Sequence, residues 1–486
     1  MIIRRIVSLM GLILLATSAA FAQHDVGGGS TSGGASSTDS SRGAVRVRRA
    51  PATTPRRPRP AVRRGMTAEQ YNQQGDTLFD AEQYDDALDA YTKAVQIKPI
   101  ATAYYHMGWI YNDRNDFDQA LPALQQAIRL DPNYATAFDE VGYTYRNLKR
   151  YDEAFFAYRR AITIDPTYAK AFYDIGWTYN DQNRYADALQ PLTQATALRP
   201  DYAEAYNELG YAYRKLHRSQ DAINAYRRAI ALKTDYASAY FGLGDVYFYD
   251  TNQYREAIQA YNNALATKPD NATANYNVGW SYNELKQYQQ AIPYFQKALQ
   301  QKPDYAEAYA ELGYAYRRVD RFDDALRSYN QAIGLKSDYA QPRFGLGDLY
   351  FYNLNRYQDA INAYEAALRI QPNNSAANYN IGWSYNDMQR YADAIAPLRE
   401  AVRLKPEYAE AYNELGYAYL NVQRYNEAVS NFKEAVRIKP DYGMAYYNLG
   451  ITYLNMRDRN RALEQYRILQ RIDTERAAKL YAAINK

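Results

Sequence analysis

Residues Ala203–Tyr236 read AEAYNELGYAYRKLHRSQDAINAYRRAIALKTDY, and the same pattern recurs every 33 to 35 residues from Ala68 onward. We number the places of each copy from its first residue, so that Gly210 occupies place 8 of this copy. A glycine stands at place 8 in all twelve copies, from Gly75 to Gly450. A fixed period of this length indicates an array of repeated structural units.

Each copy contains two stretches of about a dozen residues with apolar residues three and four apart, which predicts two helices. Small residues recur where such helices would approach most closely: glycine at place 8, and alanine twelve or thirteen residues later. Tyrosine occurs 54 times in the chain, and we expect its rings to fill the space beside the small residues. Proline follows the second stretch in nine copies and is expected to end that helix.

This pattern resembles the tetratricopeptide repeat, and the resemblance extends from residue 68 to about residue 472. It implies an all-α fold, a right-handed superhelical solenoid in which each helix pair packs on its neighbours. We therefore assign residues 66–472 to twelve repeats.

The last residues, 473–486, predict a capping helix. Asp473 is a favourable residue at the start of a helix, and four apolar residues then share one face. These residues are Ala477, Leu480, Tyr481 and Ile484. A solenoid needs such a helix, with a polar outer side, to remain soluble.

The sequence also repeats with a second, longer period of 103 residues. NELGYAYRKL, AELGYAYRRV and NELGYAYLNV begin at Asn207, Ala310 and Asn413. The copies that contain Trp177, Trp280 and Trp383 each open a triplet of copies that differ at place 9, which is tryptophan, then tyrosine, then aspartate. Trp109 opens a shorter, two-copy version, and Ile451 stands where the last aspartate would be. The aspartate copies, which begin at Ala237 and Ala340, contain one extra residue before their next alanine.

The chain begins with a segment typical of export. The arginines of MIIRR precede the apolar run IVSLMGLILLATSAAFA, and Ala20-Phe21-Ala22 matches a small-residue cleavage site. We expect residues 1–22 to be a cleaved signal peptide and the protein to be exported, to the periplasm or outside the cell. An uncleaved membrane anchor is the alternative, because the apolar run nearly reaches the length that spans a bilayer.

Residues 23–65 predict a disordered linker that is first rich in Gly and Ser and then in Arg and Pro. The linker holds nine arginines and two aspartates, a balance of +7, whereas the whole chain carries +4. A basic tail therefore precedes a mildly acidic body. Residues 42–64 are candidates for contact with an acidic surface, and a solvated spacer is the alternative. No aromatic residue interleaves with these arginines, so no specific nucleic acid is expected.

Several classes of function are excluded by the residues present. The chain has no cysteine, and His24, His106 and His217 lie far apart in sequence. Neither a metalloprotease motif, a phosphate-binding loop nor a nucleophile elbow occurs. We expect no enzymatic activity, no cofactor and no metal site.

The resemblance places ligand contacts on the first helix of each copy. In this family the first helices line a concave groove, and places 2, 5, 9, 12 and 13 commonly contact the ligand. Places 5, 9 and 12 share a helix face that differs from the face of the repeat glycine. The predicted groove residues are Trp109, Trp177, Trp280, Trp383, Tyr173, Tyr276, Tyr379, Tyr143, Tyr211, Tyr314, Tyr417, Asn180, Asn283, Asn386, Arg214, Arg317, Asp245 and Asp348.

Aromatic rings in this groove would bind apolar side chains, prolines, arginines or sugar faces, while Asn and Arg supply directional hydrogen bonds. The alternative is that the same residues pack neighbouring copies together. Three acid–base pairs 33 residues apart are candidate bridges between adjacent first helices: Asp113 with Arg146, Asp181 with Arg214, and Glu284 with Arg317.

The leading hypothesis is an exported scaffold that holds extended protein segments in an aromatic groove through many weak contacts. One alternative is a glycan or cell-wall binder that uses the tryptophans against sugar rings. Another is a self-assembling structural protein, joined end to end or from groove to basic tail. No transmembrane span is expected after signal cleavage.

Overall fold

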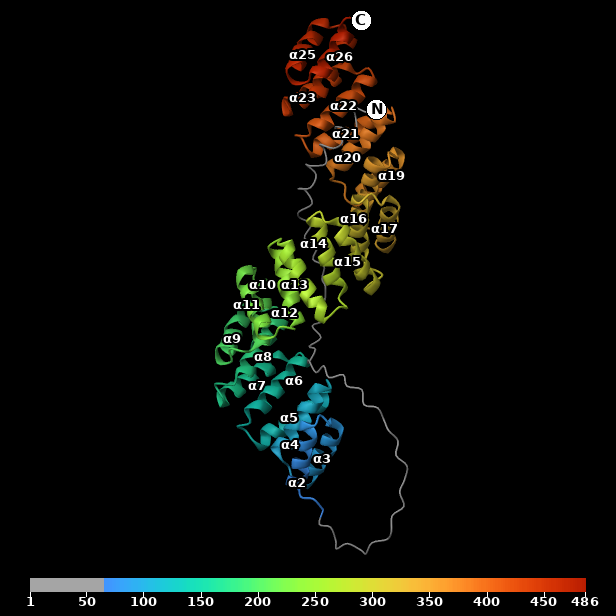
Figure 1. The fold of residues 1–486 in the computed structure, drawn as a ribbon. Helices are drawn as coiled ribbons and strands as arrows, with labels where there is room; N and C mark the ends of the chain where they lie inside the picture. The colour runs from blue at the N-terminus through green and yellow to red at the C-terminus, as the bar shows by residue number, and fades with distance from the viewer. Residues whose placement is uncertain (1–64) are drawn as a thin grey trace, which may run out of the picture. The chain divides into compact units, whose positions relative to one another are not determined.

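The protein is a series of short helices joined by tight turns (Figure 1). The computed structural model describes residues 65–486, which form helices and turns and no strand. The predicted signal peptide, and all of the predicted linker except Gly65, lie outside the described residues. Each copy supplies a first and a second helix and one more helix follows, so the predicted all-α repeat fold is confirmed.

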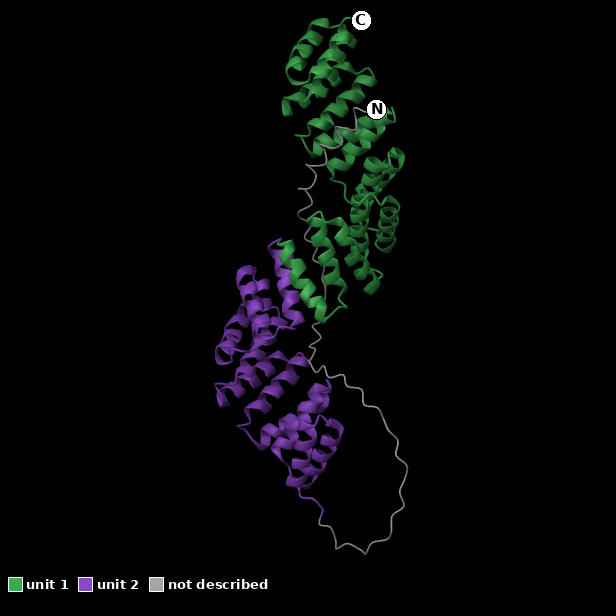
Figure 2. Ribbon diagram, in the orientation of Figure 1, with its two compact units in different colours: residues 1–17, 253–486 green, residues 18–252 purple. Residues whose placement is uncertain are grey.

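The described helices divide into two compact units (Figure 2). Unit 2 holds the described residues up to Asn252. Its first helices are α2 (Ala68–Asp80), α4 (Ala101–Asp113), α6 (Ala135–Asn147), α8 (Ala169–Asp181), α10 (Ala203–Lys215) and α12 (Ala237–Asp245). Its second helices are α3 (Tyr84–Ile97), α5 (Phe117–Leu130), α7 (Tyr151–Ile164), α9 (Tyr185–Leu198) and α11 (Ser219–Leu232).

Unit 1 spans Gln253–Lys486 in its described part. Its first helices are α14 (Ala272–Glu284), α16 (Ala306–Arg318), α18 (Ala340–Asp348), α20 (Ser375–Asp387), α22 (Ala409–Asn421) and α24 (Gly443–Asn455). Its second helices are α13 (Tyr254–Thr267), α15 (Tyr288–Gln301), α17 (Phe322–Leu335), α19 (Tyr357–Leu368), α21 (Tyr391–Leu404), α23 (Tyr425–Ile438) and α25 (Arg459–Ile472), and α26 (Thr474–Ile484) ends the chain.

The glycine at place 8 allows the two helices of a copy to approach closely. The side chain at place 24, on the second helix, lies against this glycine, as Phe295 does against Gly279 and Tyr329 against Gly313. A methyl group added to Gly279 would stand 2.8 Å from Cε1 of Phe295, whose ring is completely buried. The prediction that tyrosine rings fill the space beside the small residues is confirmed at five glycines: Gly75, Gly142, Gly210, Gly313 and Gly347. Phenylalanine fills this space at Gly279 and Gly416, and leucine at Gly108, Gly176, Gly382 and Gly450.

Gly279→Ala is expected to lower the free energy of unfolding by about 1–3 kcal/mol, because the added methyl overpacks a filled contact. Gly334→Ala is the matched control. Gly334 lies inside α17 with no atom within 4 Å of an added methyl, so alanine should stabilise the protein by about 0.5–1 kcal/mol. Urea unfolding of the two variants measures the difference, and shifts of the same sign would contradict the close approach.

One residue in the left-handed backbone region follows the first helix of every copy. Its φ lies between 53° and 62°, and none of these residues is glycine. His217, which was expected in this turn, is among them. The twelve residues are Glu82, Asn115, Lys149, Asn183, His217, Asn252, Lys286, Asp320, Asn355, Gln389, Gln423 and Arg457. A left-handed residue reverses the chain so that the second helix returns along the first.

The extra residue of the aspartate copies is taken up within the first helix. α12 and α18 each continue directly into a π-helical turn, η1 (Val246–Asp250) and η2 (Leu349–Asn353). A π turn accommodates one more residue without ending the helix. Phe248 and Phe351 in these turns are buried, whereas Tyr249 is half exposed.

The last helix, α26, begins as the sequence predicts. Oδ1 of Asp473 accepts a hydrogen bond from the backbone N of Arg476 over 3.0 Å. Leu480 is completely buried and lies beside Gly450, where other copies place a residue of their own second helix. α26 therefore completes the packing of the last copy.

The expectation that Tyr481 belongs to the buried face of α26 is wrong. Half of this residue is exposed, and its ring lies beside that of Tyr466 with the centroids 5.1 Å apart. Tyr481 directly follows Leu480 in sequence and so lies at the edge of the apolar stripe. From this edge its hydroxyl reaches water while its ring still packs.

Candidate functional site on the first helices

A stack of three aromatic rings recurs in the tryptophan copies. The ring of Tyr276 at place 5 lies between that of Trp280, with centroids 5.8 Å apart, and that of Tyr305, at 4.8 Å. The corresponding separations are 5.6 and 4.9 Å around Tyr379, and 5.8 and 5.0 Å around Tyr173. The third ring comes from the turn before the next copy, and the sequence assigned no such role to it. The signal that could have revealed it is the fixed distance of 29 residues between place 5 and that turn.

The tryptophans are the more accessible part of these stacks. Tyr276 and Tyr379 are buried, whereas all four tryptophans are partly exposed. Nε1 of Trp280 donates to Oε1 of Glu284 over 3.2 Å, which places the carboxylate of place 13 beside the ring. A ligand that reaches this face would therefore meet an indole ring and a carboxylate together.

Trp109, the first of the four tryptophans, has different aromatic neighbours from the other three. It packs edge-on against Phe79, with ring centroids 4.9 Å apart, and tilted against Tyr84 at 5.8 Å. Both partners belong to the first copy, and Trp109 remains partly exposed.

The acidic and basic groups of the first helices pair in the opposite direction to the one expected. Each arginine binds a carboxylate of the following copy. Arg146 pairs with Asp181, Arg214 with Asp245 at 2.7 Å, and Arg317 with Asp348 at 3.4 Å. The predicted pairs of Arg146 with Asp113, Arg214 with Asp181 and Arg317 with Glu284 are therefore wrong. The arginine at place 12 lies towards the next helix of the array, so its long side chain reaches forward.

These pairs account for four of the predicted groove residues. Arg214 also approaches Asp250 of the π turn, with Nε 3.3 Å from Oδ2. Burial raises the pKa of Asp250, and Arg214 opposes that shift. Oδ1 of Asp348 accepts a hydrogen bond from the hydroxyl of Tyr364 over 2.7 Å. Contact of Arg214, Arg317, Asp245 or Asp348 with a ligand stays a prediction, and it would have to compete with these bonds.

The asparagines at place 12 form hydrogen bonds to a glutamate of the following copy. Nδ2 of Asn283 donates to the backbone oxygen of Glu311, 3.3 Å away, and to its Oε2, 3.1 Å away. Asn180 and Asn386 make the same two bonds to Glu208 and Glu414. All three asparagines are buried, so ligand contact through them stays a prediction that requires their amides to leave these bonds.

The glutamates that accept these hydrogen bonds were not predicted from the sequence. Each stands at place 6 of a tyrosine copy, 28 residues after the asparagine. Burial raises the pKa of Glu311, and the hydrogen bonds from Gln341 and Asn283 oppose the shift. The recurrence of Asn and Glu at this spacing could have identified the pair.

Ala315→Thr is expected to stabilise the protein by about 1 kcal/mol. Oδ1 of Asn283 is buried without a hydrogen-bond partner, whereas Oδ1 of the corresponding Asn112 accepts from Oγ1 of Thr144 over 2.8 Å. Ala315 occupies in its own copy the place that Thr144 occupies, and a threonine there would supply the missing donor. Ala315→Val has the same shape without the hydroxyl and should give no gain in urea unfolding. Equal effects of the two variants would contradict this explanation.

A cluster of buried charges joins the third and fourth copies. Nζ of Lys170 contacts Oδ2 of Asp139, Oδ2 of Asp174 at 3.0 Å and Oε1 of Glu140 at 3.4 Å. All three carboxylates are buried, and Oδ1 of Asp139 has no hydrogen-bond partner. Burial raises the pKa of Asp139 well above its usual range, and Lys170 opposes the shift. This cluster was not predicted from the sequence, where the lysine at place 2 is its only signal.

Three of the four tyrosines at place 9 of the tyrosine copies pack against second helices. Tyr211, Tyr314 and Tyr417 each meet the first tyrosine of the preceding second helix with ring centroids 5.8 Å apart. Tyr143 instead lies 6.5 Å from Trp177. Their rings bridge copies, and ligand contact at these four tyrosines stays a prediction.

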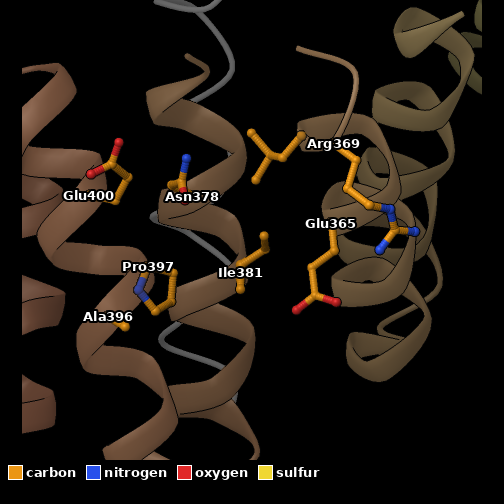
Figure 3. Close-up of a pocket in the computed structure, with 8 residues that line it drawn as sticks. Glu365, Arg369, Asn378, Ile381, Ala396, Pro397 and Glu400 are labelled. Carbon is orange, nitrogen blue, oxygen red and sulfur yellow. The ribbon is translucent and has the colours of Figure 1, made fainter. Parts of the chain in front are cut away.

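A shallow hollow of about 500 Å³ lies elsewhere, between α19, α20 and α21 (Figure 3). Figure 3 shows Glu365 and Glu400 on two different helices, with Ile381 of α20 between them. α19, which contributes Glu365 and Leu368 to the lining, has 12 residues where the other second helices have 14. None of the predicted groove residues lines it.

His106 serves local packing on the first helices. Its Nδ1 lies 2.9 Å from the hydroxyl of Tyr91 and 3.2 Å from Oδ1 of Asp76, and burial lowers its pKa.

Within residues 65–486, no three His, Cys, Asp or Glu side chains gather closely enough to hold a metal ion. None of the helices of that part combines the length and apolarity needed to cross a bilayer.

Family models match nearly all of the repeat region. Models described as tetratricopeptide repeat match residues 246–306, 310–375, 349–409 and 379–443, residues 68–100 and 101–134, and residues 282–333. A model described as TPR repeat matches residues 142–180, 176–217 and 218–249.

Similar proteins cover parts of the chain. Heat shock protein STI1 of Saccharomyces cerevisiae is 29% identical over 72 residues, which are 14% of this chain and 12% of that protein. YrrB, described as a TPR protein with an unusual peptide-binding site, is 28% identical, covers 39% of this chain and 97% of its own, and superposes with a TM-score of 0.37. MamA is 34% identical and covers 36% of this chain and 94% of its own, with a TM-score of 0.33.

Proposed function

The chain belongs to the tetratricopeptide repeat family, and on that premise we propose that it is an exported scaffold holding extended protein segments against its first helices. Repeats of this family make it a scaffold for protein–protein interaction. The finer proposal is that the aromatic residues at places 5 and 9 of the first helices bind the partner. One observation supports it. The stack of Trp, Tyr and turn Tyr recurs at intervals of 103 residues, with the tryptophan partly exposed each time.

Packing of a single repeat does not require this longer period. The tyrosine and aspartate copies place Tyr or Asp where the tryptophan copies place Trp, and all three kinds fold into the same helix pair. A period shared by exposed tryptophans supports a partner that makes the same contact several times. Several weak contacts on one partner add up to strong binding through the high effective concentration of the second and third contacts.

The carboxylates beside the tryptophans narrow the chemistry of the partner. A partly exposed indole next to an acidic group favours a segment with basic and apolar side chains.

Export is supported by residues 1–22 alone. Cell fractionation followed by N-terminal sequencing tests it, and a cytoplasmic protein that retains Met1 would refute it.

The triple variant Trp177→Ala, Trp280→Ala and Trp383→Ala tests the proposed face. We expect its binding to segments selected from a peptide array to fall at least tenfold, because each repeated contact loses its ring. The packing of Trp177 on Arg146 and of Trp383 on Phe351 predicts some loss of stability as well. Binding is therefore measured where circular dichroism shows intact helices.

Two further variants separate binding from packing. Replacing the same three tryptophans by phenylalanine keeps an aromatic face and should restore most of the binding. Phe156→Ala removes an aromatic residue that is 67% exposed on second helix α7 and should leave binding unchanged. Undiminished binding by the alanine variant would rule out the proposed face, and selective capture on a glycan array would favour a sugar ligand instead.

A further inference from the structure

A carboxylate follows each tryptophan of the first helices four residues later. Residues four apart lie on the same face of a helix, so each pair presents a ring and an acid side by side. The pairs are Trp109 with Asp113, Trp177 with Asp181, Trp280 with Glu284, and Trp383 with Asp387.

One of these pairs already holds an arginine of the chain. Cζ of Arg146 lies 3.3 Å from the ring centroid of Trp177, and its Nη2 pairs with Oδ2 of Asp181. The Arg146 side chain is only 6% exposed. The ring attracts the cation and the carboxylate accepts its N–H groups, so the combination recognises a guanidinium.

The Trp109–Asp113 pair repeats this chemistry without an internal arginine. The residue that corresponds to Arg146, at place 12 of the preceding copy, is Phe79. Phe79 meets Trp109 edge-on and supplies no charge. Trp109 is partly exposed and Asp113 is exposed. Within residues 65–486, no ion pair is recorded for Asp113, and part of the Trp109 side chain can be reached from solvent beside the rings of Phe79 and Tyr84.

The charge of the surrounding face also favours a cation. The first helices of unit 2, including η1, carry twelve Asp and Glu against four Lys and Arg. The second helices of the same unit carry eight against six. Several of these acids are paired within the chain, as Asp139 and Asp174 are with Lys170. The acids of α2 and α4, by contrast, share their helices with no Lys or Arg: Glu69, Asp76, Asp80 and Asp113. A cluster of like charge of this kind attracts a basic segment and weakens as salt is added.

A segment with this chemistry is part of the same chain. Residues 42–64 contain nine arginines and no acidic residue, and only three residues separate them from α2, the first helix of unit 2. A stretch of this length spans at most about 76 Å when extended, at roughly 3.3 Å per residue. Neighbouring packed helices lie about 10 Å apart, so this length suffices to reach α4.

We propose that an arginine of residues 42–64 binds between Trp109 and Asp113 of the same chain, as Arg146 binds between Trp177 and Asp181. The rest of the segment lies along the acidic first helices of unit 2. The inference depends on the proposed function only in using the first helices as the binding face. It makes the segment a built-in competitor, which a basic partner must displace.

The test compares the full chain with a full chain in which the nine arginines of residues 42–64 are changed to glutamine. A fluorescent peptide of residues 42–64 is titrated into each at low salt, and its anisotropy is followed. We expect binding to the neutralised chain, and binding at least tenfold weaker to the natural chain, because its own segment occupies the site.

Matched variants locate the site within the neutralised chain. Asp113→Asn and, separately, Trp109→Leu should each weaken binding of the peptide at least tenfold. Asp118→Asn removes an exposed carboxylate of second helix α5 in the same copy and should change binding less than twofold. Circular dichroism confirms that each variant retains its helices.

Three results would overturn the proposal. Absence of peptide binding to either chain would show that unit 2 has no site for this segment. Equal binding to both chains would show that the segment does not occupy the site in its own chain. Equal losses from Asp113→Asn and Asp118→Asn would show only diffuse attraction. Failure here leaves the proposed function standing if segments from the peptide array still bind in a tryptophan-dependent way.

Discussion

Lys170→Met is expected to lower the free energy of unfolding by about 3 kcal/mol at pH 7. Removing one partner of a buried ion pair costs about 3–5 kcal/mol, and the lower end applies because 38% of the Lys170 side chain is exposed. The variant leaves Asp139, Asp174 and Glu140 buried together without their shared cation. Urea unfolding at pH 7 measures the loss.

The same variant should be less harmful at low pH. Burial already raises the pKa of Asp139 well above its usual range, and loss of the lysine raises it further. A carboxyl whose pKa is higher in the folded than in the unfolded state stabilises the fold at low pH, and that contribution disappears as the pH rises through the folded value. The difference between Lys170→Met and the natural chain should therefore shrink between pH 7 and pH 5.

Two comparisons make this prediction specific. Lys93→Met removes a lysine that is half exposed and pairs with Asp89 on the surface of α3, so a change below about 1 kcal/mol is expected. Adding Asp139→Asn to Lys170→Met should recover part of the loss, because one of the stranded charges is gone. A loss that is the same at pH 5 and pH 7 would show that Lys170 acts through packing alone.

We expect the protein to unfold completely as the pH rises from 10 to about 11. Burial raises the pKa of five tyrosines of the second helices that lie against the repeat glycines. These tyrosines are Tyr91, Tyr158, Tyr226, Tyr329 and Tyr364. Tyrosines between first helices add to them, and burial raises the pKa of Tyr134 to about 12.

The direction of the effect follows from proton binding. An unfolded tyrosine ionises near pH 10, whereas these folded tyrosines keep their protons above it. Above pH 10 the folded state therefore binds more protons, and its stability falls by about 1.4 kcal/mol per tyrosine and pH unit. Five such groups give about 7 kcal/mol per unit, comparable to the whole stability of an ordinary domain. Loss of helical circular dichroism should coincide with the rise of tyrosinate absorbance.

Single substitutions check that buried hydroxyls are the cause. The hydroxyl of Tyr158 is buried without a hydrogen-bond partner, so Tyr158→Phe should stabilise the protein at pH 7 and move the alkaline transition upward. The hydroxyl of Tyr364 donates to Asp348 and accepts from Asn380, so Tyr364→Phe should destabilise it by about 1–3 kcal/mol at pH 7. Tyrosinate that forms gradually, well before helix is lost, would contradict the prediction.

Much of the fold could be predicted because its rules are local and repeated twelve times. The pairing of Gly279 with a ring at place 24 follows from helical periodicity and from the need for a small residue at a close contact. The extra residue of the aspartate copies was visible as a count of residues. Its form, the π turns η1 and η2, was not, because sequence spacing does not say how a helix absorbs an insertion.

The candidate site was predicted less completely. The four tryptophans are partly exposed, whereas the asparagines at place 12 that the sequence assigned to the same face are buried in bonds to the next copy. The left-handed turn residue, such as Lys149 or Arg457, also went unpredicted in most copies. Four of the twelve are asparagine and none is glycine, so no single residue type marks the position.

The sequence alone determined the helix pair, its period, the contact of small residue and ring, and the longer period of the tryptophans. Each depends on spacing along one chain segment. Only the tertiary structure decided that Arg146 binds forward to Asp181 and Trp177, and that Lys170 gathers three carboxylates. Contacts between copies depend on how far each helix is rotated and displaced against the next. A shift of one helical turn, about 5.4 Å, changes which side chains meet, and sequence spacing does not fix it.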